Sequence, residues 1–304
     1  MAMVSRHGRE SSGIADLFLS FVTAFIVFAC CTTVVRAEEP LALSIMTFNV
    51  RTSNIDDGEN GWDHRKALVV DTILSHAPHV LGFQEALADQ LDYLSETLPE
   101  YRWLGVDRGL NGGTGLSEYT PIFYRYKELV PIESGNFWLS STPEGPRGAG
   151  WRRNVSRIVT WAQFHHVTPG LRFYVFNTHL TLRRGPRQLE SVRMIKERLA
   201  TLPSDSAIVV MGDFNAIAET SDTWELATTD GLRDAWVVAT ERYGPSRTSG
   251  EFGPPEEAPD GRIDWILVGG PIGVLSVETV VPDDRGRYPS DHYPVVAEIE
   301  VREE

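Results

Sequence analysis

Apolar positions along the chain follow two different periods, which predict two kinds of element. Runs typical of β-strands cover residues 41–50, 79–83, 101–106, 121–126, 157–166, 171–180, 207–211, 263–268, 274–281 and 295–301. Apolar residues at helical spacing predict helices at residues 62–77, 88–98, 187–202, 224–228 and 233–240. Strands outnumber helices and often neighbour one another in sequence. This favours mixed, largely antiparallel sheets with helices outside over a parallel doubly wound sheet.

Two stretches follow neither period. Residues 140–156 and 244–262 are rich in Gly, Pro and charged side chains, a composition typical of surface loops. Loops of this length in a compact domain usually serve a function. No internal repeat or low-complexity linker divides the chain after its first residues.

The N-terminal segment differs in composition from the rest. A basic start is followed by the uncharged run 17–35, and Val35 and Ala37 then have the spacing of a cleavage site. This order predicts a signal peptide at residues 1–37 and a secreted or exported protein. The run exceeds the usual ~7–15 residues, so an uncleaved membrane anchor is one alternative. A lipid-modified Cys30 is another.

Residues 38–304 remain for the folded part, a length that suits a single domain. Both cysteines, Cys30 and Cys31, precede it, so the domain contains no disulfide. The whole chain carries a formal charge of −14, and the domain about −15, because the leader is slightly basic. A domain this acidic does not attract polyanions by bulk charge. A phosphate-bearing substrate would therefore require a metal ion or a local cluster of arginines.

Polar side chains recur at the ends of the apolar strands. Carboxylate, amide and imidazole groups occupy such positions at Asn49, Gln84, Glu85, Asn177, His179, Asp213, Asn215, Asp264, Asp291 and His292. Side chains two residues apart on a strand share a face. We therefore expect Asp213 and Asn215 to point together, and likewise Asn177 and His179.

Convergence of these strand ends would create a metal site. A lone buried carboxylate costs several kcal/mol unless a cation or hydrogen-bond donors compensate it. The oxygen ligands of the set suit Mg²⁺, Mn²⁺ or Ca²⁺. Zinc is disfavoured, because the domain has no cysteine and its two candidate histidines lack ligand spacing. Taken singly, each residue has an ordinary interpretation as a helix cap, turn former or buried hydrogen-bonding group. The functional interpretation depends on the whole set.

The ordered motifs "FNV", "QE", "NTHL", "GDFN", "RIDWI" and "SDHYPV" resemble those of the endonuclease/exonuclease/phosphatase superfamily. The resemblance runs from about residue 43 to residue 301. It implies the fold of pancreatic-type deoxyribonuclease, an α/β four-layer sandwich of two packed mixed β-sheets flanked by helices. It also implies a site at one rim of the sandwich and hydrolysis of a phosphoester with Mg²⁺ or Mn²⁺.

The same resemblance implies which residues hold the metal. Glu85 resembles the main metal ligand of the superfamily. Asn49 resembles its neighbour on the metal or the phosphate. Asp291 resembles an additional carboxylate on the metal side.

The resemblance also implies roles in the chemical step. Asp213 resembles the residue that orients or deprotonates the attacking water, and Asn215 resembles a donor to a phosphate oxygen. His292 resembles the histidine on the phosphate, with Asp264 as its pair. His179 resembles a second histidine that acts as phosphate donor or leaving-group acid. In the deoxyribonuclease branch that histidine pairs with a glutamate, a place that Glu118 could fill.

Two arginine-rich loops bear on the substrate. Arg152, Arg153 and Arg157 precede one strand, and Arg183, Arg184 and Arg187 follow another, so together they predict a local positive funnel. We favour Arg157 as a substrate-binding residue. The Asn154 sequon would place a glycan at this rim, so we expect it to be unused.

Aromatic residues give a further, looser resemblance. The stretches "NFWLSSTPEG" and "RIVTWAQF" resemble the carbon catabolite repressor-type deadenylase branch of the superfamily. Tyr119, Phe137, Trp138 and Trp151 could stack on a base or sugar, or could lie in the core.

We therefore hypothesise a metal-dependent phosphoester hydrolase, in the first place a nuclease-like phosphodiesterase or 3′–5′ exonuclease. One alternative is a phosphatase or phospholipase C-type enzyme on phosphoinositides, sphingomyelin or sugar phosphates. Another is a binding protein with an inactive site. We expect a phosphoester as substrate, no protein partner, and a monomer.

Overall fold

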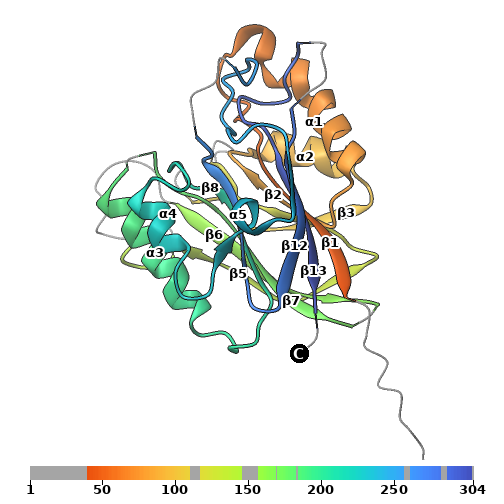
Figure 1. Ribbon diagram of the computed structural model, residues 1–304. Coiled ribbons are helices and arrows are strands. Elements are labelled where there is room, and N and C mark those ends of the chain that lie inside the picture. Colours follow the sequence, from red (N-terminus) through yellow and green to blue (C-terminus); the bar gives the residue numbers. More distant parts are fainter. Residues whose placement is uncertain are drawn as a thin grey trace, which may run out of the picture. The chain divides into compact units, whose positions relative to one another are not determined.

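The computed structural model describes residues 40–109, 117–145, 157–168, 170–182, 184–256, 261–281 and 286–302. Two β-sheets pack against each other in these ranges, and helices cover their outer faces (Figure 1). The predicted four-layer α/β sandwich is confirmed. The predicted signal peptide lies outside the described residues. Among the helices described, none combines the length and apolarity needed to cross a membrane.

The first sheet has the strand order β10-β12-β13-β1-β2-β4-β3. In that order, its strands are Glu241–Tyr243, Ile272–Thr279, Val295–Val301, Leu41–Asn49, Val80–Gln84, Ile122–Arg125 and Tyr101–Leu104. The β1/β2 and β10/β12 pairs are parallel, and the other pairs are antiparallel.

The second sheet has the strand order β5-β6-β7-β8-β11-β9. In that order, its strands are Leu129–Trp138, Ile158–His166, Arg172–His179, Ile208–Asp213, Asp264–Gly269 and Arg233–Asp234. Only β7 and β8 are parallel. Both sheets are therefore mixed and largely antiparallel, as the strand-rich pattern predicts.

Helices cover the outer face of each sheet. Helices α1 (Trp62–His76) and α2 (Ala88–Thr97) pack on the first sheet. Helices α3 (Pro186–Leu199) and α4 (Asp222–Ala227) pack on the second. The short elements η1 (Gly58–Asn60) and α5 (Ala235–Val238) complete the described helices.

The central strands are apolar on both faces because both faces are covered. In β1, Leu43 and Ile45 enter the core between the sheets, whereas Met46 and Phe48 pack under α1 and α2. This explains why β1 reads as a continuous apolar run rather than an alternating one.

A polar link joins the two sheets behind the strand ends. Asn177 donates from Nδ2 to the carbonyls of Phe83 and Pro121, both at 2.8 Å, and accepts from Gln84 Nε2 at 2.7 Å. Gly82 makes room for it, since a Cβ there would lie 2.7 Å from Asn177 Cγ. Asn177 therefore fixes the spacing of the sheets at the level just below His179.

The element predictions failed at β5, at residues 233–240 and at the three-residue edge strand β10, which was not predicted. Strand β5 was not predicted, because Pro131, Glu133 and Gly135 interrupt its apolar pattern. As an edge strand with a register shift between Pro131 and Glu133, it tolerates these residues. The helix predicted at residues 233–240 is instead β9 followed by the single turn α5.

Candidate active site

Backbone pairing brings the polar strand ends together. Asp213 at the end of β8 lies opposite His179 of parallel β7 on one side and Asp264 of antiparallel β11 on the other. Asn49 at the end of β1 pairs with Gln84 at the end of β2 in the facing sheet. The predicted convergence at one rim of the sandwich is therefore a consequence of strand register.

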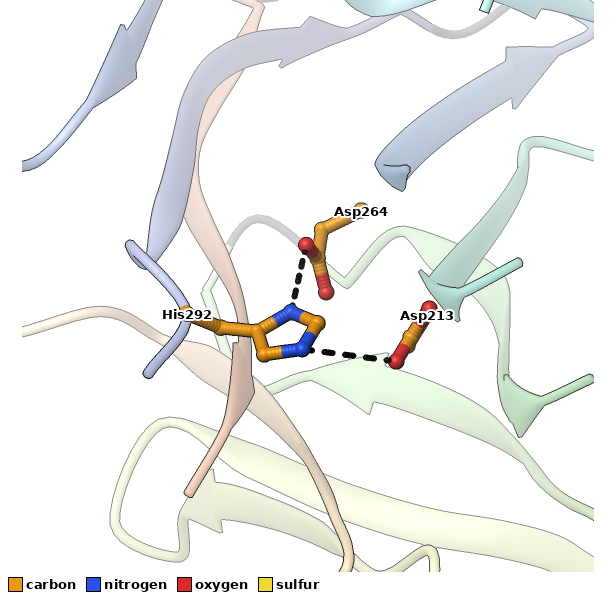
Figure 2. Close-up of side chains that lie close together, drawn as sticks. All are labelled: Asp213, Asp264 and His292. Carbon is orange, nitrogen blue, oxygen red and sulfur yellow. Dashed lines mark hydrogen bonds and ion pairs between the residues drawn. The ribbon is translucent and has the colours of Figure 1, made fainter. Parts of the chain in front are cut away.

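Asp213, Asp264 and His292 form the centre of the cluster (Figure 2). His292 Nδ1 lies 2.9 Å from Asp264 Oδ2, and its Nε2 lies 3.9 Å from Asp213 Oδ2. All three residues are buried. The imidazole is thus held from one side by Asp264 and directed toward Asp213 on the other.

Burial gives these groups unusual protonation behaviour. Burial and the carboxylate of Asp264 raise the pKa of Asp213 to about 7. Burial lowers the pKa of His292, but Asp264 and Asp213 outweigh it, so that this pKa lies well above its usual range. The pair therefore combines a carboxyl group that titrates near neutral pH with a cationic imidazole.

Asn49 connects Asp213 to Glu85. Its Nδ2 donates to Asp213 Oδ2 at 3.0 Å and to Glu85 Oε1 at 3.2 Å. Glu85 Oε2 accepts from the backbone N–H of Thr52 at 3.3 Å. Glu85 has a left-handed backbone (φ 62°) and is half-exposed. This strained conformation turns its carboxylate from the strand end toward the rim.

These residues fit a divalent metal by the chemistry of their donors. The oxygen atoms of Glu85, Asn49 and Asp213 are hard ligands of the kind that Mg²⁺ and Mn²⁺ take. The atoms of Asp213, Asp264 and His292 also lie within 4.8 Å of one another. The oxygen donors of Glu85, Asn49 and Asp213 therefore fit such a metal without a contribution from His292.

His179 faces a second group of charged side chains. Its Nε2 lies 3.5 Å from Asp213 Oδ2, and its Nδ1 lies 4.0 Å from Glu118 Oε2. Glu118 in turn forms an ion pair with Arg108. The structure thus places Glu118 near His179, with no hydrogen bond from His179 Nδ1 among the described residues.

Arg157 lies beside this group and has free donors. Arg108 and Arg157 are each 9% exposed. Arg157 Nε and Nη1, Arg108 Nε and His179 Nδ1 are buried without a hydrogen-bond partner among the residues that the structure describes. Burial and the charge of Arg108 lower the pKa of Arg157 to about 10, so that it is cationic at neutral pH. Burial and both arginines hold the pKa of His179 well below its usual range.

Asn215 is placed differently from the prediction. Strand β8 ends at Asp213, and Asn215 has a left-handed backbone (φ 51°), so the two side chains do not share a strand face. The Asn215 N–H donates to Asp213 Oδ1 at 2.9 Å, and its Nδ2 donates to the Leu180 carbonyl at 3.0 Å. Asn215 here orients Asp213 through its backbone N–H and anchors the turn through one of its two amide N–H donors. Phe214 packs away from the site, on Trp265.

The carboxylate of Asp291 forms an ion pair with Arg51. Arg51 Nη1 lies 3.4 Å from Asp291 Oδ2, and Arg51 also forms two 3.0 Å hydrogen bonds with Asp57. Ser290 Oγ donates to Asp291 Oδ1 at 3.1 Å. Asp291 therefore lies at the margin of the cluster.

The aromatic and arginine residues considered for substrate contacts lie in different environments, and some lie outside the described residues. Tyr119 packs its ring edge-on against Trp103, 6.0 Å between centroids, next to Glu118. Phe137 is buried in the core. Arg184 is exposed. Arg152, Arg153, Arg183, Trp151 and Asn154 lie outside the described residues.

Sequence reasoning missed Arg51 and Arg108. Both are single arginines in irregular segments, which no period or motif distinguishes from solvated surface charges. Each forms an ion pair with a carboxylate near the site, and Arg108 is also buried, which becomes visible only once the fold is known.

Solved structures resemble this chain over most of its length. An endonuclease/exonuclease/phosphatase from Bacteroides vulgatus is 32% identical, with a TM-score of 0.79, over 86% of this chain and 100% of that one. A mannosyl-6-phosphatase of Bacteroides thetaiotaomicron is 29% identical, with a TM-score of 0.76, over 84% of this chain and 99% of that one.

Matches to curated relatives are shorter. Nocturnin of Drosophila melanogaster is 24% identical over 174 residues, which cover 51% of this chain and 24% of that protein. The chain spans 59% of the length of another curated relative, at 26% identity.

The family model of the endonuclease/exonuclease/phosphatase family matches residues 46–292. This range contains every residue of the cluster described above. The chain belongs to the endonuclease/exonuclease/phosphatase family, whose members hydrolyse phosphoesters.

Proposed function

We propose that this chain is a divalent-metal-dependent phosphoester hydrolase whose substrate is a small phosphomonoester, such as a sugar phosphate. The observation that carries this proposal is the pair of buried guanidinium groups near His179, Arg108 and Arg157, which have N–H donors without a hydrogen-bond partner among the described residues.

The number of free donors favours a monoester. A terminal phosphate presents three non-bridging oxygens and a double negative charge, whereas a diester presents two and a single charge. Among the described residues, two buried N–H groups of Arg157 and one of Arg108 have no hydrogen-bond partner. Guanidinium N–H donors suit the charged oxygens of a phosphate. The 29% identity with a mannosyl-6-phosphatase and the net charge of −14 support the same choice.

Each residue of the cluster has a separate role in the proposed hydrolysis. Asp213, with a pKa of about 7, orients the attacking water and accepts its proton near neutral pH. His292 is held by Asp264 and directs Nε2 as a donor toward the phosphate. Glu85 and Asn49 would hold the metal, which would act as a Lewis acid on the phosphate oxygens. Arg157 binds a non-bridging oxygen.

A second candidate is a nuclease-like phosphodiesterase, as the motifs first led us to expect. The T-shaped pair of Trp103 and Tyr119 beside Glu118 favours it, because aromatic rings near a phosphate site can stack on bases. The match with Nocturnin is a further point of support.

A substrate panel distinguishes these candidates. Purified protein is assayed with Mg²⁺, Mn²⁺ and EDTA on sugar phosphates, p-nitrophenyl phosphate, bis(p-nitrophenyl) phosphate, DNA, RNA, phosphoinositides and sphingomyelin. We expect metal-dependent release of phosphate, with the highest kcat/KM on a monoester. A higher kcat/KM on DNA or RNA would favour the second candidate. Inactivity on every phosphoester would refute both and favour a binding protein.

A further inference from the structure

Arg65 on α1 is a buried cation. Its residue is 2% exposed, and no ion pair of its guanidinium is found among the residues described. The ring of Trp62 lies 5.1 Å below it. Burying a charge without a counter-charge is costly unless its hydrogen bonds are made. The position therefore requires another source of compensation.

Backbone carbonyls provide that compensation. Arg65 Nη1 donates to the carbonyls of Val50 (2.5 Å) and Pro289 (3.0 Å), and Nη2 donates to that of Arg51 (2.6 Å). Nε donates to the carbonyl of Asn60 at 3.0 Å. One side chain thus binds four carbonyls from three places in the chain.

Two of these places carry active-site residues. Val50 and Arg51 directly follow Asn49 at the end of β1, and Pro289 directly precedes the segment 290–292, which ends in His292. The two segments also meet directly, since Ser290 Oγ donates to the Asn49 carbonyl at 2.7 Å. Arg65 therefore connects chain segments more than 200 residues apart in sequence, both of which carry residues of the cluster.

A third segment packs on the same guanidinium. The ring of Phe252 lies 5.9 Å from Arg65, at a residue with a left-handed backbone (φ 60°). The loop that carries Phe252 is bonded to the His292 segment, because Gly250 N–H donates to the Asp291 carbonyl at 2.6 Å. Arg65 lies where the three segments meet.

We propose that Arg65 is a positioning residue for hydrolysis, holding the Asn49 segment and the His292 segment in register. This inference rests on the proposed function. Arginine suits the role, because its planar fork sets several N–H donors at fixed angles, which a lysine ammonium cannot reproduce. The alternative is that Arg65 merely stabilises α1.

Variants at Arg65 and a matched control separate these roles. Arg65→Lys keeps the charge, and Arg65→Met keeps much of the length without any donor. Ile73→Ala removes a fully buried side chain from the same helix, and this side chain cannot donate a hydrogen bond to the active-site segments. For each protein we would measure Tm, kcat, KM and hydrogen–deuterium exchange of residues 49–53 and 286–293 in EDTA.

The expected result is specific to positioning. Arg65→Met should lose about 10–100-fold in kcat with KM changed less than about threefold, because small misplacements of reacting groups cost this much. Arg65→Lys should recover only part of kcat. Exchange should rise in both segments together. Ile73→Ala should lower Tm to a similar degree, yet keep kcat within about threefold.

Two outcomes would overturn the proposal. One is a folded Arg65→Met variant with wild-type kcat. The other is exchange in both segments equal to that of the wild type. The exchange measurement does not depend on turnover, so it tests the placement of the segments even if the wild-type protein hydrolyses no phosphoester.

Discussion

Asp213 receives polar contacts from both sheets and from the segment before the last strand. Asn49, the Asn215 N–H, His179 and His292 all surround its two oxygens. These hydrogen-bond donors, rather than one strong ion pair, offset part of the free-energy cost of burying the Asp213 carboxylate. Its pKa is therefore about 7. Because this pKa differs from that of an aspartate in an unfolded chain, Asp213 makes the stability of the protein depend on pH.

We expect the Asp213 carboxyl group to lower the stability of the metal-free protein as pH rises from 4 to 8. The folded state holds the Asp213 proton up to about pH 7, whereas an unfolded chain releases it near pH ~4. Between these values the folded state binds more protons, so raising the pH favours unfolding. In Asp213→Asn this loss should be smaller by at least ~1 kcal/mol. Urea denaturation in EDTA at a series of pH values measures the difference. A parallel dependence in both proteins would contradict the raised pKa.

Glu85 should be indispensable for turnover but not for folding. Its carboxylate is half-exposed and bonded only to Asn49 and the Thr52 N–H among the described residues, so Glu85→Ala removes little packing. We expect kcat/KM to fall at least ~10³-fold, because a Lewis acid contributes several kcal/mol. The unfolding free energy should change by less than ~1 kcal/mol. Glu96→Ala, on the exposed side of α2, is the matched control. Activity retained in Glu85→Ala would refute the metal assignment.

At the scale of elements, the central strands were predictable because both their faces are apolar. β1, β2, β7 and β8 carry buried side chains at nearly every position, which gives a strong signal in sequence. Edge strand β5 has exposed positions and a register shift, so it has no such period. The strands that were missed or misassigned, β5, β9 and β10, all lie at sheet edges.

Gly212 shows how one strand position supports the site. Its φ is 147°, and a Cβ at this position would lie 2.0 Å from the Thr178 carbonyl oxygen of β7. We expect Gly212→Ala to destabilise the protein by at least ~3 kcal/mol and to displace Asp213. Gly273→Ala in β12, where the nearest atom is 3.8 Å away, should cost much less. Thermal unfolding of both variants provides the test, and equal Tm values would contradict this account.

At the scale of the whole molecule, the order of the motifs along the sequence predicted the site before the spatial arrangement of its residues was known. Asp213, Asp264, His292, His179 and Glu85 were predicted because their motifs occur in the order of a known superfamily. Arg65 and Arg108 were not, because single arginines in a helix or loop carry no spacing that marks burial. Their roles arise from contacts between segments that only the folded chain brings together.

The charge of the whole molecule sets a final prediction. With a net charge of −14, the whole chain repels polyanions at long range, while Arg108 and Arg157 attract phosphate only at short range. Single-stranded DNA should therefore inhibit monoester hydrolysis weakly at low salt, and inhibition should not weaken as KCl rises from about 20 to about 200 mM. A protein that recruits DNA through many phosphate contacts would show inhibition weakening by ~10-fold or more over this range. Such a fall in inhibition would show that the local arginines, rather than the net charge, determine the electrostatic attraction of DNA. It would favour the nuclease candidate.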